Sequence, residues 1–119
     1  MYYQILILPL EHQTKQVMAK QISAKEVIDS NKTFYAKKWQ QNGYYLIEKF
    51  VYHEENDCYE LFVQKTSGWY SWGIAYEKPF TCNDGKVITN KSWWLYIFEH
   101  NSFKFSFEEM KDNKNYNLD

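Results

Sequence analysis

Arginine is absent from the 119-residue sequence, so that all 14 basic residues are lysine. Its absence removes the side chain that most often grips phosphate or carboxylate through two parallel hydrogen bonds, and it excludes arginine-finger chemistry. The formal net charge is −1, which gives no overall positive field for binding nucleic acid or anionic membranes. Lysine without arginine, with abundant Asn, Tyr, Phe and Ile, is typical of an AT-rich gene from a low-GC bacterium or a phage.

Glycine and cysteine are also scarce, with 4 and 2 residues. The glycines form neither a phosphate-binding loop nor a dinucleotide fingerprint. Cys58 and Cys82 match no zinc or redox spacing, and we expect two reduced thiols. A zinc site that combines them with His53 and His100 lacks a close pair of ligands. The sequence therefore predicts no metal ion and no cofactor.

Long apolar runs are missing as well. The opening segment MYYQILILPL has no positive residue before its apolar part and no small-residue cleavage site, so it does not resemble a signal peptide. No run approaches the roughly 20 apolar residues that span a bilayer. We therefore expect a cytoplasmic protein without a membrane partner.

Apolar and aromatic side chains are plentiful. Hydrophobic residues make up 45% of the chain and aromatic residues 20%, which is too apolar for intrinsic disorder. A chain of this length forms one domain and buries roughly two thirds of the surface of its unfolded state. We expect one globular domain over residues 1–109 and a polar tail over residues 110–119.

One helix has a clear start signal. Ser23 and Glu26 have the spacing of a capping box, and Ile22 and Val27 form the hydrophobic staple around it. A helix is therefore predicted from Ser23 to about residue 30. Residues 11–22 fit a second helix or part of a strand.

Beyond residue 33, turn signals rich in Asn, Asp, Gly and Ser separate segments rich in aromatic and β-branched residues. We expect strands near residues 2–8, 33–39, 44–53, 58–65, 68–76, 86–90, 92–100 and 103–108. The predicted fold class is α+β: one strongly bent antiparallel sheet, a meander that at its limit closes into a half barrel, with one or two short N-terminal helices.

Two aromatic segments raise the question of which side chains are core. In the strand predicted over residues 68–76, alternation places Tyr70, Trp72, Ile74 and Tyr76 together on a core face. Trp69 lies on the opposite face beside small residues, where either a helix of the protein or a binding partner approaches closely. In residues 92–100 both faces are apolar, which predicts a central strand covered on both sides.

Acidic residues gather in the predicted hairpin turn at residues 54–57. The plain interpretation is a solubilising loop, whereas a negative loop beside exposed aromatic residues suits docking onto a basic protein. The candidate partner-binding residues are Trp69, Glu54, Glu55, Asp57, Tyr52 and Tyr59.

These features favour a small cytoplasmic protein that is not an enzyme and that binds another protein. An immunity protein or antitoxin that occludes the active site of a basic, nuclease-type toxin is the example we expect. The first alternative is a module that binds a small ligand or nucleic acid on an aromatic sheet face, although the net charge disfavours nucleic acid. The second is a small nuclease with His53 and His100 as acid and base, which requires the two rings to be neighbours.

Overall fold

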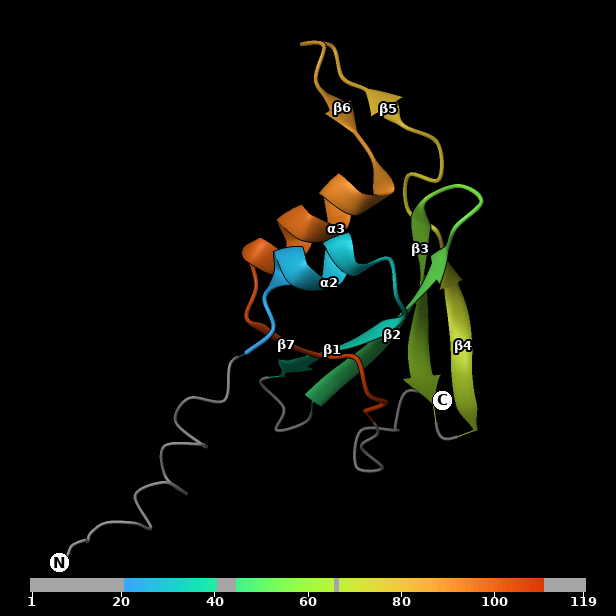
Figure 1. Cartoon of the computed structure of the whole chain (residues 1–119), viewed down its shortest axis with the longest axis vertical. Helices are drawn as coiled ribbons and strands as arrows, with labels where there is room; N and C mark the ends of the chain where they lie inside the picture. The colour runs from blue at the N-terminus through green and yellow to red at the C-terminus, as the bar shows by residue number, and fades with distance from the viewer. Residues whose placement is uncertain (1–20, 41–44, 66, 111–119) are drawn as a thin grey trace, which may run out of the picture.

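The computed structural model describes residues 21–40, 45–65 and 67–110, which form a five-stranded sheet, two short helices and a two-stranded arm (Figure 1). The elements are α2 (Ala24–Ser30), β1 (Phe34–Trp39), β2 (Tyr45–His53), β3 (Cys58–Lys65), β4 (Gly68–Gly73), β5 (Phe80–Thr81), β6 (Val87–Ile88), α3 (Asn90–Glu99) and β7 (Phe103–Ser106). The strand predicted near residues 2–8, the ambiguous residues 11–20 and most of the predicted tail, residues 111–119, lie outside the described residues.

The sheet has the order β4-β3-β2-β1-β7, and every neighbouring pair is antiparallel. Strands β1 to β4 form the predicted meander, and β7 returns to pair with β1. The α+β class with an antiparallel sheet is confirmed. The sheet is open, with β4 and β7 at its two edges, so the half barrel is not confirmed. Among the described residues, neither helix has the length and apolarity that crossing a membrane requires.

Helix α2 begins as its capping box predicts. The backbone N–H of Glu26 donates to Ser23 Oγ at 3.1 Å, and the Ser23 N–H donates to Glu26 Oε1 at 3.1 Å. The helix ends at Asn31, whose left-handed backbone (φ 56°) closes it. Val27 and Ile28 are buried, and Ile22 packs against the same core. The single N-terminal helix that falls within the described residues is thus confirmed.

Helix α3 replaces the central strand predicted over residues 92–100, and that prediction is wrong. Thr89 caps the helix, since its side chain accepts the Ser92 N–H at 3.1 Å and the Ser92 side chain accepts the Thr89 N–H at 2.8 Å. Trp94 and Phe98, four residues apart, pack against the core. An apolar run of this length fits a helix and a strand equally well, and packing on the sheet decides between them.

The core lies between the sheet and the two helices, which lie side by side over one face in Figure 1. Phe34 is its centre: its ring stacks on Phe50 at 4.9 Å and meets Tyr59, Phe98 and Phe105 edge to face. These side chains share one face of the sheet because they lie opposite each other on neighbouring strands: Phe34 pairs with Phe50, and Phe50 pairs with Leu61. The centre of this face of the sheet is therefore built from aromatic rings.

Strand β4 does not carry the predicted core face. Tyr70 is 44% exposed and Trp72 is 71% exposed, and the strand stops at Gly73, before Ile74 and Tyr76. The register shifts between Leu61 and Phe62 of β3, which places a bulge at this end of β4. Because β4 is an edge strand that lies beyond the helices in Figure 1, its large side chains find no cover from them.

Candidate functional site

A row of aromatic rings crosses the outer side of α3. The ring of Phe80 lies 6.4 Å from that of Tyr76, Tyr76 lies 5.5 Å from Trp93, and Trp93 stacks at 6.1 Å on Tyr96. The row ends at His100, whose ring is 4.1 Å from Tyr96. Each ring supports the next, so the row has a defined shape before anything binds it.

The helical spacing of α3 explains why two of these rings face outward. Trp94 and Phe98 take the inner stripe, and this rotation places Trp93 and Tyr96, three residues apart, on the outer side. Phe80 and Tyr96 are each 54% exposed. The inner stripe of α3 therefore packs on the sheet, and its outer stripe carries the exposed aromatic rings.

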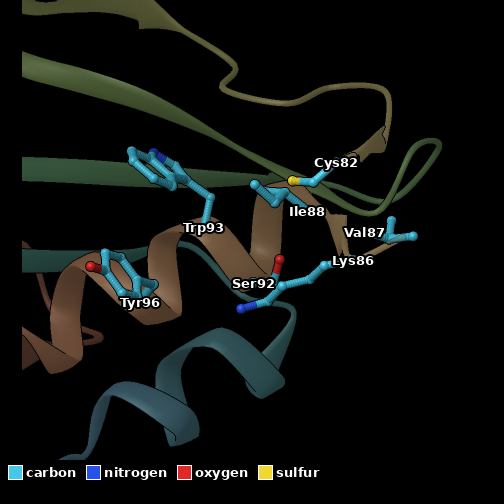
Figure 2. A pocket seen from close by; sticks show the side chains of 7 residues that line it. All are labelled: Cys82, Lys86, Val87, Ile88, Ser92, Trp93 and Tyr96. Carbon is cyan, nitrogen blue, oxygen red and sulfur yellow. The ribbon is translucent and has the colours of Figure 1, made fainter. Parts of the chain in front are cut away.

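An apolar pocket of about 510 Å³ opens between α3 and the β5–β6 arm. Figure 2 shows Trp93 and Tyr96 projecting from α3, while Cys82, Val87 and Ile88 come from the arm. The polar contributions are Lys86 at the rim and the hydroxyl of Ser92. A cavity of this size and lining suits an apolar side chain or small molecule.

A second depression, of about 380 Å³, lies between α3 and the end of β4. Trp72 and Gly73 form one side of it, and Trp93 and Trp94 form the other. Because Trp93 lines both depressions, they belong to one continuous surface. We call it the aromatic surface, and its members are Trp72, Tyr76, Phe80, Val87, Trp93 and Tyr96.

The acidic turn, residues 54–57, borders this surface. Asn56 Nδ2 donates to Glu77 Oε2 at 3.0 Å, beside Tyr76. Lys91, two residues before Trp93, reaches Asp57 Oδ1 with its Nζ at 2.8 Å. These two contacts connect the turn between β2 and β3 to the segments that carry the aromatic rings.

Part of the charge in this turn is neutralised locally. Lys91 and the Tyr52 hydroxyl both donate to Asp57 and lower the pKa of its carboxyl group. The hydrogen bond to Asp57 also raises the pKa of Tyr52 to about 12, so this hydroxyl stays protonated at neutral pH. Glu54, Glu55 and Glu77 are exposed, and their side chains carry the negative charge that faces solvent.

The other partner-binding candidates from the sequence have different positions. Tyr59 is fully buried and donates its hydroxyl to Val27 O at 3.0 Å, so it offers no side-chain surface to a partner. Trp69 lies on the sheet face away from the helices, 5.7 Å from the Tyr35 ring, with its indole N–H donating to Glu109 at 3.3 Å. Trp69 and the acidic turn therefore lie in different parts of the molecule.

The two histidines of the nuclease alternative have separate surroundings. His53 ends β2, and its Nε2 lies 2.7 Å from Glu60 Oε1. His100 caps the far end of α3, whose first residue, Asn90, contacts Tyr59 near His53. A helix of ten residues rises about 15 Å, so the geometry does not make the two rings an acid–base pair.

The described residues contain no disulfide and no cluster of metal ligands. Cys58 and Cys82 are free thiols, the first buried and the second partly exposed. Among the residues that the structure describes, no group of three His, Cys, Asp or Glu side chains is placed to bind a metal ion.

None of the six members of the aromatic surface was among the partner-binding candidates from the sequence. One signal for α3 was present: Thr89, a common N-cap residue, stands shortly before the apolar run, although Ser92 replaces the Glu or Gln that is usual at the third helical position. Reading that run as a helix would have separated Trp93 and Tyr96 from the core pair Trp94 and Phe98. No family model, curated protein or solved structure matches the chain.

Proposed function

We propose that this protein acts by binding another protein through the aromatic surface. The observation that carries the proposal is the row of contacting rings from Phe80 to Tyr96, with large side chains exposed on both sides of it. Tyrosine and tryptophan are enriched at protein interfaces, where they bury a large area at a small entropic cost. Scattered single apolar residues need no such explanation, but a connected surface does.

The acidic turn favours a basic partner. Glu54, Glu55 and Glu77 project exposed carboxylates at the border of the aromatic surface, where they would steer a positively charged protein toward it. The narrower form of the proposal is an inhibitor that covers the cleft of a basic enzyme, as an immunity protein or antitoxin covers a nuclease-type toxin. In that form the aromatic side chains fill the cleft, and the carboxylates occupy the position of the nucleic-acid phosphates.

The test is affinity capture from a lysate of the producing organism, followed by titration calorimetry with the purified partner. A double variant, Phe80→Ala with Tyr96→Ala, removes two exposed rings of the surface. Trp39→Ala is the matched control, because Trp39 is 57% exposed and lies at the other end of the sheet, against Tyr45. We expect binding to fall at least a hundredfold in the double variant, since each anchor contributes about 1.4 kcal/mol or more, and to be unchanged in the control.

A charge variant tests the basic partner separately. Glu54→Lys with Glu55→Lys should lower the association rate about tenfold at low salt and leave the dissociation rate nearly unchanged. A partner bound equally well by the double aromatic variant and by Trp39→Ala would exclude the aromatic surface as its binding site. An association rate that does not respond to the charge variant would exclude electrostatic steering by the turn.

A second candidate function is supported by the pocket between α3 and the arm. Its volume of about 510 Å³ and its lining by Trp93, Tyr96 and Ile88 suit a small apolar ligand. A thermal-shift screen of apolar and aromatic compounds tests this function. Hits that are lost in Ile88→Asp and kept in Trp39→Ala would favour the ligand over the protein partner.

A further inference from the structure

The two edges of the five-stranded sheet are built differently. β7 has four residues and carries Lys104 with an exposed side chain. β4 has six residues, and its sequence GWYSWG contains neither a charge nor a proline. Short length, lysine and proline are the usual features that keep edge strands from pairing with other chains. β7 has two of these features and β4 has none.

A bulge, another protective feature, affects one end of β4 alone. It lies where Leu61 pairs with Gly73 and Phe62 pairs with Ser71. From Gly68 to Ser71 the strand follows β3 in unbroken register. Its outer backbone edge is thus regular over the stretch that includes Tyr70, with open space at the Cβ position of Gly68.

The exposed side chains of β4 also favour the pairing of this strand with a strand of another chain. Tyr70 is 44% exposed and Trp72 is 71% exposed, and both belong to the edge strand that Figure 1 shows to one side of the helices. An added strand would place side chains beside both rings and bury them in part, because neighbouring strands lie about 4.8 Å apart. Burial of two large rings at an edge is a substantial apolar gain.

We propose that β4 pairs antiparallel with β4 of a second copy of this chain, which joins the two sheets into one. Directly opposite residues in such a pair face the same side, so the two-fold axis lies midway between the two copies of one residue. With the axis between the two copies of Tyr70, Trp69 lies opposite Ser71 of the partner subunit within the regular stretch, and Trp72, the extra residue of the bulge, lies beside Gly68 of the partner subunit. A large ring meets a glycine at both symmetric positions, and no like charges meet.

The second copy fits this edge better than the basic partner of the proposed function does. β4 itself carries no charge that would select a basic protein, whereas the exposed carboxylates lie on the acidic turn and at Glu77. Trp72 belongs to both surfaces, whereas Tyr70 belongs to β4 alone and Tyr96 to α3 alone, so variants at Tyr70 and Tyr96 distinguish self-pairing from binding through the outer rings of α3.

Sedimentation equilibrium of the full chain tests the proposal. The wild type should have twice the chain mass of 14.5 kDa at micromolar concentration. Tyr70→Lys places two ammonium groups opposite each other at the axis and should raise the dissociation constant of the dimer about tenfold or more. Trp39→Lys is the matched control, because Trp39 is 57% exposed and ends β1, outside both β4 and the aromatic surface. Circular dichroism confirms that each variant is folded.

Cross-linking tests the register. Tyr70→Cys in a Cys82→Ser background should form an intermolecular disulfide under mild oxidation, since opposite Cβ atoms lie about 5 Å apart. Trp39→Cys in the same background should not. A monomeric wild type would overturn the proposal. So would a dimer that persists in Tyr70→Lys and is lost in Tyr96→Ala, because this result would assign association to the aromatic surface.

Discussion

The buried side chain of Asn90 hydrogen-bonds to both the N–H and the carbonyl group of Tyr59. Asn90 Oδ1 accepts the Tyr59 N–H at 2.7 Å, and Asn90 Nδ2 donates to the Tyr59 carbonyl at 3.0 Å and to the Ala75 carbonyl at 2.7 Å. One amide thus connects the first turn of α3 to β3 and to the segment that follows β4. These bonds fix the position of α3, and with it the aromatic surface.

Replacing this amide should destabilise the fold. Asn90→Ala leaves the N–H of Tyr59 and two carbonyl groups without their partner, and we expect the free energy of unfolding to fall by about 2 kcal/mol. Asn83→Ala, in the exposed turn of the arm, should change it by less than about 0.5 kcal/mol. Urea denaturation followed by tryptophan fluorescence measures both. Equal stability of the two variants would show that the amide does not hold α3.

The hydroxyl of Tyr59 makes a second, smaller contribution. It donates to the carbonyl groups of Val27 and Ile28 in α2, at 3.0 and 3.1 Å. Tyr59→Phe keeps the ring and removes the donor, so we expect a loss of about 1 kcal/mol in the free energy of unfolding. Tyr96→Phe, at an exposed position, is the control and should have no measurable effect in the same assay.

The tryptophans differ in their contributions to stability. Trp94 packs against Phe50 at 4.9 Å and against Phe98 at 5.9 Å, and Trp94→Ala should lower the free energy of unfolding by about 3 kcal/mol. Trp72, on the exposed edge strand, should change it by less than about 0.5 kcal/mol when replaced by alanine. Thermal and urea unfolding of the two variants compare them directly. A large effect of Trp72→Ala would contradict its exposed placement.

Glu48 should make stability depend on pH. It lies between Ala36 and Val63 on the helix-facing side of the sheet, and burial raises the pKa of its carboxyl group from 4.5 to about 7, against the opposing influence of Lys38. The unfolded chain therefore releases this proton at lower pH than the folded chain. Stability should fall as the pH rises from 4.5 to about 7 and then level off.

The neutral variant Glu48→Gln isolates this effect from the other titrating groups. The difference in the free energy of unfolding between Glu48→Gln and the wild type should shift in favour of the variant by about 3 kcal/mol across that range. Urea denaturation at a series of pH values measures the difference. A difference that is independent of pH would show that Glu48 ionises equally easily in the folded and unfolded chains.

The sequence by itself determined the elements whose signals lie within a few residues. Ser23 and Glu26 specify where α2 begins, because a capping box closes on itself. Turn residues and alternating apolar positions specify β1 and β3, whose observed bounds agree with the prediction to within one residue. The acidic turn was found in the same way, since it joins two adjacent strands.

The tertiary structure decided what depends on residues far apart in the sequence. Trp93 and Trp94 lie in a helix because Trp94 and Phe98 find Phe50 on the sheet, and neither the helical nor the strand pattern alone identifies that neighbour. Trp72 is exposed because the strand order leaves β4 at an edge, whereas local alternation treats all strands alike. Local signals determine the type of an element, but burial depends on which elements lie against it.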